Sequence, residues 1–379
     1  MNTSIYRLTD STWNLHPNSQ SVNPNEANLV LCFSAKALLE TEEIYNTLRS
    51  KFSTAEIAFC STAGEIYQNE VFDNSFIAVA IQFEKTKVIA ASVNISNYSN
   101  TQEAAISLAS KLPSENLAHV LVFSDGALVN GSELVKGLTT QLPQNILITG
   151  GLAGDAANFN STLVGLNKQP AHGEIVAIGL YGSNIKITHG SQGGWEMFGL
   201  EKRVTRSSAN VLMEIEGQNA LDLYKKYLGK EAHNLPSSAL LFPLSVTIPD
   251  AKKPLVRTIL SVNEKEKLMI FAGDIPVGST VRFMKSTFDK LIAAADQAAA
   301  LTVTGHKKMP SFSLLISCVG RKLILADKVV EEVKAVQQSY TNETVMAGFY
   351  SYGEISPFNE GGNCQLHNQT MTITSFYED

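Results

Sequence analysis

The segment Gly348-Phe349-Tyr350-Ser351-Tyr352-Gly353-Glu354-Ile355 decides the fold, because its pattern occurs twice more, earlier in the chain. Phe59-Cys60-Ser61-Thr62-Ala63-Gly64-Glu65-Ile66 shows the same order of apolar residues, glycine and acid. Ile148-Thr149-Gly150-Gly151-Leu152-Ala153-Gly154-Asp155 is a looser copy. Self-similarity of this kind predicts internal structural repeats.

The residues around each copy recur as well. Each glycine–acid loop is preceded by an apolar run and a helical stretch, and is followed by another apolar run. We therefore predict repeats of the order strand, helix, strand, glycine–acid loop and strand over residues 29–95, 117–190 and 312–376. Because helices and strands alternate, the expected class is α/β with mixed sheets.

The predicted division is into two domains after a lead-in. The lead-in covers residues 1–28, the first domain (29–195) holds two repeats, and the second (196–379) holds the third. The boundary is placed at a glycine-rich linker, Gly190-Ser191-Gln192-Gly193-Gly194-Trp195, where three glycines lie close to one of only two tryptophans. Glycines at such a site allow close approach of the backbone to a flat or anionic group.

Composition limits the class of protein. The chain of 379 residues is 44% hydrophobic and 17% charged, which suits a globular protein with a sizeable core. A net charge of −6 and the lack of basic clusters argue against nucleic acid as a partner. We expect neither a signal peptide nor membrane insertion, since no apolar run approaches the roughly 18 residues of a membrane span. Four cysteines lie far apart, and together these features predict a reduced, cytoplasmic protein.

The glycine–acid loops are candidate ligand-binding elements. Their acids could pair with an ammonium group, and their glycines allow a ligand to approach the backbone. The alternative is structural, with each glycine forming a turn and each acid capping backbone N–H groups. The candidates in and beside these loops are Ser61, Thr62, Gly64, Glu65, Asp125, Gly150, Gly151, Asp155, Tyr350, Tyr352 and Glu354.

Three further residues complete the predicted site. His367 and Asn368 are adjacent and could present donors and acceptors to a carboxylate or carbonyl, or His367 could be an interior histidine bonded to backbone. Trp195 of the linker is the third. We expect the ligand between the glycine–acid loops of the first domain and the Tyr350–Glu354 and His367–Asn368 segments of the second.

Patterns for metal or enzyme chemistry are weak. No histidine or cysteine pair has the spacing of a zinc site, and Ser124-Asp125-Gly126 lacks the G-x-S-x-G elbow of a nucleophile. His189, beside the glycine-rich linker, is the candidate axial ligand if haem is bound, and otherwise a histidine at a strand end. We therefore expect no metal, no required cofactor and no catalytic residue.

Several of these segments, in this order, resemble the FIST (F-box and intracellular signal transduction) sensory domain, in both its N-terminal and C-terminal parts. The matching segments include 60–66, 150–155, 194–199, 216–221, 271–276, 317–321, 348–355 and 366–370. The resemblance implies a sensory module that binds a small ligand, an amino acid or a related metabolite. It also implies a separate output protein: a histidine kinase, a diguanylate cyclase or phosphodiesterase, or a chemoreceptor.

The main hypothesis is thus a cytoplasmic, non-enzymatic ligand sensor of FIST type. Some members of the family bind haem, so the alternative is a nitric-oxide sensor with haem on His189 that regulates a histidine kinase or a cyclic-di-GMP enzyme. The least favoured hypothesis is a hydrolase that uses Asp125 or Asp155.

Overall fold

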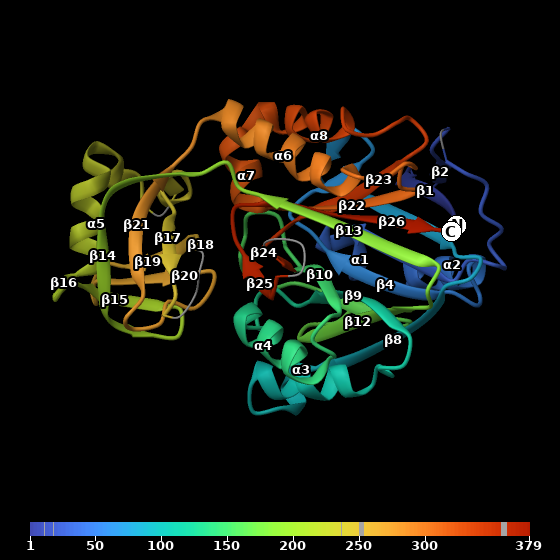
Figure 1. Cartoon of the computed structure of the whole chain (residues 1–379), viewed down its shortest axis with the longest axis horizontal. Helices are drawn as coiled ribbons and strands as arrows, with labels where there is room; N and C mark the ends of the chain where they lie inside the picture. Colours follow the sequence, from blue (N-terminus) through green and yellow to red (C-terminus); the bar gives the residue numbers. More distant parts are fainter. Residues whose placement is uncertain (11, 18, 236, 250–253, 358–361) are drawn as a thin grey trace.

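The computed structural model describes residues 1–379 except 11, 18, 236, 250–253 and 358–361. Figure 1 shows a large body of three sheets with helices, which we call the ring, and a small body built around one sheet. The strands of the ring are β1 (Asn2–Thr9), β2 (Thr12–Leu15), β3 (Leu29–Ser34), β4 (Glu56–Ser61), β5 (Glu65–Tyr67), β6 (Glu70–Phe72), β7 (Phe76–Gln82), β8 (Lys87–Asn94), β9 (Leu117–Ser124), β10 (Leu147–Leu152), β11 (Val164–Leu166), β12 (Glu174–Tyr181), β13 (Ile185–Gln192), β22 (Phe312–Cys318), β23 (Val345–Ser351), β24 (Gly353–Pro357), β25 (Cys364–His367) and β26 (Met371–Glu378).

Helices cover the outer faces of the ring. They are α1 (Lys36–Leu39), α2 (Glu42–Lys51), α3 (Thr101–Ser110), α4 (Gly131–Gln141), α6 (Phe288–Val303), α7 (Val319–Leu325) and α8 (Val329–Gln337), with 3-10 turns η1 (Ile95–Asn97) and η4 (Ala326–Lys328). In the second half of the chain, α5 (Ala220–Leu228) lies outside the ring, whereas α6 and α8 cover it. Asn219 and Thr287 cap α5 and α6 with their side chains, as their residue types favour.

The three predicted repeats share one topology, which confirms the repeated strand–helix–strand–strand unit. In each repeat two parallel strands are joined through a helix, and a third strand pairs antiparallel with the first. The strands are β3, β4 and β7 in the first repeat, β9, β10 and β12 in the second, and β22, β23 and β26 in the third. The class is α/β with mixed sheets, as expected.

The repeats also exchange strands. After the glycine–acid loop of each repeat, a short strand leaves for the sheet of another repeat: β5 pairs with β23, β11 with β4, and β24 with β10. In the first two repeats, the strand that follows the repeat's third strand also joins another sheet: β8 pairs with β12, and β13 pairs with β26. Each sheet therefore contains strands from more than one repeat, and the three sheets close on one another.

The predicted lead-in contains a strand of this ring. β1 pairs along its length with β7, beside the third strand of the repeat, as β8 and β13 do in the other two sheets; in the first sheet β2 then forms the edge. Trp13 packs edge-on against Phe76 with ring centroids 5.1 Å apart. Residues at the start of the chain thus complete the sheet of the first repeat, next to the end of the chain in Figure 1.

The centre of the ring is apolar. Strands from all three sheets contribute buried aromatic side chains, and the rings of Phe33 and Phe349 stack with centroids 5.1 Å apart. Phe123 meets both rings edge-on. Because parallel strands covered on both faces read as continuous apolar runs, this packing explains the runs seen in the sequence.

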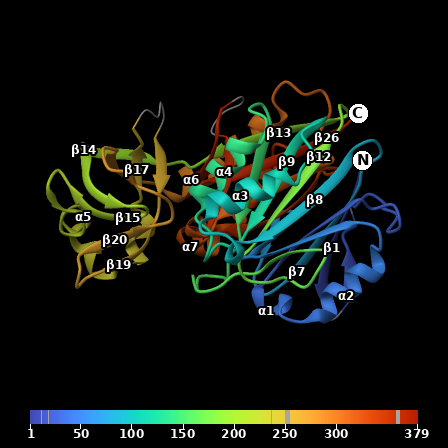
Figure 2. The same cartoon turned by 90° about the horizontal axis from the view of Figure 1, so that it is seen from below.

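The small body comes mainly from one continuous stretch, residues 196–285 (Figure 2). Its elements are β14 (Glu196–Ser208), β15 (Val211–Ile215), β16 (Gln218–Asn219), α5, η2 (Gly229–Asn234), η3 (Ser237–Leu241), β17 (Leu244–Thr247), β18 (Leu255–Arg257), β19 (Ile259–Asn263), β20 (Leu268–Phe271) and β21 (Thr280–Lys285). Its core is separate from that of the ring. The strands of the third repeat pair with strands of the first two, whereas the strands of the small body form a sheet of their own. The division of the chain into two folding domains stays a prediction.

Two other expectations concern the whole chain. All four cysteines are buried and free. In the described part of the chain, no helix has the length and apolarity needed to cross a membrane.

Candidate functional site

The three glycine–acid loops meet at one place, where the exchanged strands cross. The amide of Gly154 donates to the carbonyl of Ser61 over 2.9 Å, and the amide of Ala63 donates to the carbonyl of Tyr350 over 2.8 Å. The amide of Tyr352 donates to the carbonyl of Leu152 over 3.2 Å. The recurrence in sequence therefore corresponds to a cluster in space.

The glycines of the second loop are required by packing. Gly150 has φ +152°, and a Cβ atom built there would lie 1.9 Å from the carbonyl oxygen of Val122. At Gly151 the added atom would lie 2.9 Å from Ile316. Both glycines allow close strand approach inside the ring, which the sequence alone could not distinguish from approach to a ligand.

The Glu65 carboxylate is held inside its own repeat. It accepts hydrogen bonds from the Thr62 hydroxyl and from the amide (3.0 Å) and hydroxyl (2.7 Å) of Ser75. Burial raises the pKa of Glu65 to about 7, although these hydrogen bonds act in the opposite direction. Glu65 thus caps the backbone just before β7.

Glu354 does the same in the third repeat. Its carboxylate accepts from the Ser351 hydroxyl over 2.8 Å, and from the amide and hydroxyl of Thr370 over 3.1 and 2.8 Å. The side chain is fully buried, and burial raises its pKa to about 8. The structural alternative given above therefore accounts for the contacts of both glutamates.

The two aspartates also bond to backbone. Asp125 accepts from the amides of Ala127, Leu128 and Gly173 over 2.7–2.9 Å. Asp155 accepts from two amides of the loop that follows it and from the hydroxyl of Tyr352. Asp125 accepts from the Gly173 amide just before β12, as Glu65 accepts from the Ser75 amide just before β7. The same backbone cap therefore recurs in the second repeat, but its acid does not come from the glycine–acid loop.

The remaining candidates of the loops are internal. Ser61 donates to the Gly154 carbonyl over 2.8 Å, and Tyr350 donates to Glu332 over 2.9 Å from a fully buried position. Gly64 lies against the side chain of Lys322, which donates to the Ala63 carbonyl over 2.7 Å. A role of these residues in ligand binding stays a prediction.

His367 and Trp195 contact backbone as well. Nε2 of the buried His367 lies 2.9 Å from the Ser356 carbonyl, and burial lowers the pKa of this histidine to about 4. Nε1 of Trp195 donates to the Gln369 carbonyl over 2.9 Å. The linker carbonyl of Gly193 accepts from Arg321 over 2.7 Å, so the group that approaches the glycines is a guanidinium of the protein itself.

One predicted residue differs from all of these. The side chain of Asn368 has no exposed surface, yet neither its Nδ2 nor its Oδ1 has a hydrogen-bond partner among the described protein groups. Leaving a buried amide unpaired costs roughly 1–3 kcal/mol. Asn368 lines a cavity of about 430 Å³ between the ring and the small body, which we call the Asn368 cavity.

The Asn368 cavity is mainly apolar. The small body supplies Leu240, Ile259 and Leu260, and the ring supplies Val319 and Leu323. The described residues that line it include no charged side chain. Such a cavity with few polar groups is typical of small-molecule sites.

The cavity also has a second polar group and an aromatic wall. The hydroxyl of Thr258, 3% exposed, lacks a hydrogen-bond partner among the described residues. Tyr352 lies in the wall, stacked on Phe159 with centroids 4.6 Å apart. The Tyr352 hydroxyl accepts from the Phe159 amide over 2.9 Å, which fixes the loop after Asp155. Of the predicted site residues, the structure brings Tyr352 and Asn368 to this cavity.

A neighbouring cavity of about 300 Å³ shares part of this wall. Tyr352, Phe159, Leu260 and Ala272 line both, and Gly126 contributes to the neighbour. Both cavities lie where the two bodies meet. This placement explains why the repeats alone did not reveal these cavities, since part of each wall comes from the small body.

Sequence reasoning missed two features. Thr258 lies between the short strands β18 and β19, and no sequence motif around it marks it as a candidate binding residue. Arg321 is fully buried and forms an ion pair with Glu332 over 2.6 Å. Its Nη2 also donates to the Leu291 carbonyl over 2.7 Å, so Arg321 joins α6, α8 and the linker.

The geometry offers little to a metal or to haem. Among the described residues, no group of three histidine, cysteine or acidic side chains is placed to hold a metal ion. His189 lies in β13 opposite Thr374, and no histidine is among the described residues that line the two cavities. Cys318 lines the Asn368 cavity, but burial raises the pKa of its thiol and disfavours the nucleophilic thiolate.

Comparison with solved structures found weak likenesses. A cyanuric acid hydrolase from A. caulinodans has a TM-score of 0.38 at 7% sequence identity, covering 100% of this chain and 99% of the other. A second cyanuric acid hydrolase has a TM-score of 0.35 at 7% identity, with the same coverage. Comparison with curated proteins found no match.

Family models match most of the chain. The FIST N domain matches residues 28–218, and the FIST C domain matches residues 220–357. The two matches are consecutive and together include both bodies. The chain therefore belongs to the FIST family of sensory domain proteins.

Proposed function

We propose that this FIST protein senses a small metabolite that binds in the Asn368 cavity. The observation that supports the proposal is that Asn368 lines the cavity while both polar atoms of its buried carboxamide lack a partner among the described protein groups. A ligand that paired with this amide would remove an energetic cost already present in the free protein.

The chemistry of the cavity favours an amino acid or a related metabolite with an apolar side chain. The Asn368 amide donates through Nδ2 and accepts through Oδ1, so one side chain serves both a carboxylate and an ammonium group. The hydroxyl of Thr258 adds a second contact. The apolar walls suit an aliphatic or aromatic side chain, whereas a charged side chain would be buried without a partner.

Ligand binding would stabilise one orientation of the small body relative to the ring. The ligand touches both bodies, so its binding energy differs between their arrangements and shifts the population. A separate output protein would read this shift: a histidine kinase, a diguanylate cyclase or phosphodiesterase, or a chemoreceptor.

A thermal-shift screen of the twenty amino acids and related metabolites tests the proposal. Leucine, isoleucine, valine, methionine and phenylalanine, or derivatives of them, are expected to raise the melting temperature more than aspartate or lysine. The effect should disappear in Asn368→Leu and persist in Asn94→Leu, a matched change outside the cavity. Absence of stabilisation by every compound would refute the proposal.

A further inference from the structure

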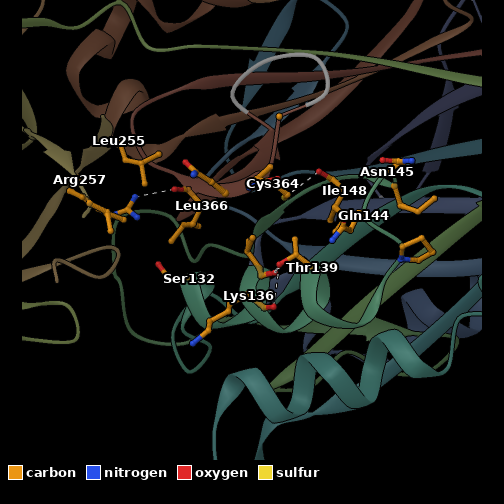
Figure 3. Close-up of a pocket in the computed structure, with 17 residues that line it drawn as sticks. Ser132, Lys136, Thr139, Gln144, Asn145, Ile148, Leu255, Arg257, Cys364 and Leu366 are labelled. Atoms are coloured by element: carbon orange, nitrogen blue, oxygen red, sulfur yellow. Dashed lines mark hydrogen bonds between the residues drawn. The ribbon is translucent and has the colours of Figure 1, made fainter. Parts of the chain in front are cut away.

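A larger cavity lies on the other side of the same contact between the bodies. Its volume is about 690 Å³, and its walls come from α4, the turn before β10 and β25 in the ring, and from β18 in the small body (Figure 3). Leu366 lies in this wall, whereas Asn368, two positions further, lies in the Asn368 cavity. Likewise, Arg257 lines the larger cavity, and the next residue, Thr258, lines the Asn368 cavity.

Arg257 gives this cavity an unusual charge. The side chain is only 2% exposed, and its hydrogen bonds go to carbonyl oxygens: Leu366 over 3.0 Å, Asp274 over 3.3 Å and Val256 over 3.4 Å. In the described part of the chain, no carboxylate oxygen lies within 4.0 Å of its guanidinium nitrogens. A buried charge is normally paired, because an isolated one is costly.

Asp274 compensates this charge only in part. Its carboxylate accepts from Asn130 Nδ2 over 3.1 Å and acts on Arg257 from a distance. Burial has the larger effect and lowers the pKa of Arg257 to about 10, so the guanidinium stays charged at neutral pH. The cation is therefore held in place, and no carboxylate of the described residues contacts it.

Other groups of the cavity are donors. Lys136 of α4 is exposed and lines the same cavity, and Figure 3 shows it with Ser132 and Arg257 on one side of the space. The Ser132 hydroxyl is buried and has no hydrogen-bond partner among the described groups. Gln144 and Gln365 add amide groups to the wall. The described lining residues include no acid.

We propose that this cavity binds a small anionic metabolite whose carboxylate or phosphate group contacts Arg257, Lys136 and Ser132. A planar guanidinium matches such anions through two parallel hydrogen bonds, and a lysine adds charge at the rim. This site is distinct from the Asn368 cavity and does not depend on the ligand proposed there. An anion held by Arg257 would strengthen the contact between the bodies, since Arg257 bonds across it to Leu366.

Anion titrations of the full chain test the proposal. Inorganic phosphate, malonate and adenosine monophosphate are added to about 10 mM, each against sodium chloride of equal ionic strength. At least one should raise the melting temperature by about 2 °C or more beyond chloride, with a dissociation constant in the millimolar range or below by calorimetry. A response to phosphate alone or to malonate alone identifies the headgroup, and either supports the site.

Variants locate the site. Arg257→Met should abolish the response, while Lys136→Gln and Ser132→Ala should each weaken affinity about 3- to 10-fold. Lys136 is exposed and Ser132 is half-buried, so both milder variants should fold and can be measured even if Arg257→Met does not fold. Lys186→Gln, at an exposed lysine of β13, should change nothing. The proposal is overturned if no anion exceeds chloride, or if both milder variants bind as the wild type does.

Discussion

In the ring, strands are exchanged among three repeats, whereas the small body is a sheet from one continuous stretch of chain. The glutamates of the ring's glycine–acid loops, Glu65 and Glu354, are buried and bonded to backbone, whereas the Lys225–Glu264 ion pair of the small body is largely exposed. The described cavities with unpaired polar groups lie at the contact between the two. If the proposed function holds, the repeats serve as scaffold and recognition needs both bodies.

The largest expected effect comes from a glycine of the ring. Gly150→Ala places a methyl group 1.9 Å from a backbone oxygen that cannot move without breaking a sheet, so the loss should be about 5 kcal/mol or more. The control is Gly217→Ala in the small body, where φ is +74° and nothing lies within 4 Å. That change should cost about 1 kcal/mol. Urea denaturation measures both, and equal losses would contradict the contrast.

The next test compares a buried and an exposed ion pair. Arg321→Met leaves the fully buried Glu332 without its partner, and such losses cost about 3–5 kcal/mol. Lys225→Met removes a surface partner of Glu264 and should cost less than about 1 kcal/mol. Chemical denaturation measures the loss in the free energy of unfolding for both variants. A loss below about 1 kcal/mol in Arg321→Met would mean that the junction of α6, α8 and the linker tolerates an unpaired charge.

The buried acids of the ring predict a pH dependence. The pKa of Glu354 is about 8 in the folded state and near 4.5 when unfolded, so the folded state binds the proton more tightly. Its contribution to stability is complete below about pH 4.5 and is lost as the pH rises through about 8. Glu65, with a pKa of about 7, acts in the same direction.

The variant Glu354→Gln mimics the protonated acid. The decline in melting temperature between pH 5 and pH 8 should therefore be shallower in this variant than in the wild type. Glu264→Gln, at an exposed acid of the small body, should leave the slope unchanged. A wild-type slope in Glu354→Gln would show that Glu354 is ionised throughout that range.

The smallest stability effect is expected at the Asn368 cavity. Asn368→Leu replaces an unpaired buried amide by an apolar group of similar size, so stability without ligand should stay equal or rise by up to about 1 kcal/mol. Asn94→Leu removes an amide that caps η1 and should cost about 1–2 kcal/mol. A large loss in Asn368→Leu would show that its amide has a structural partner.

Local patterns predicted the repeats, because apolar runs and helical periodicity act over a few residues. They did not predict the exchanged strands, since β5 and β11 are three residues long and their partners are far away in sequence. Pairing over such distances depends on the assembled core. For the same reason β1, in the expected lead-in, could not be recognised as a strand of the ring.

Part of the candidate cavity was singled out from the sequence, and the role of these residues in ligand binding stays a prediction. Tyr352 and Asn368 were singled out and line the cavity, whereas Thr258 has no signal in sequence. Repetition of an acid after glycine led to the prediction of a ligand site, and it also follows from a turn that needs the same backbone cap in each repeat. Residue types alone do not separate a ligand site from a backbone cap, because a carboxylate can accept hydrogen bonds from a ligand ammonium or from backbone N–H groups.

Isothermal titration of the most stabilising amino acid into matched variants tests the central claim most directly. If the cavity between the bodies is the site, Asn368→Leu should weaken binding at least about tenfold. Glu65→Gln, which alters an internal cap, should bind nearly as the wild type does. Full affinity in Asn368→Leu together with lost binding in Glu65→Gln would contradict the account and place recognition at the glycine–acid loops.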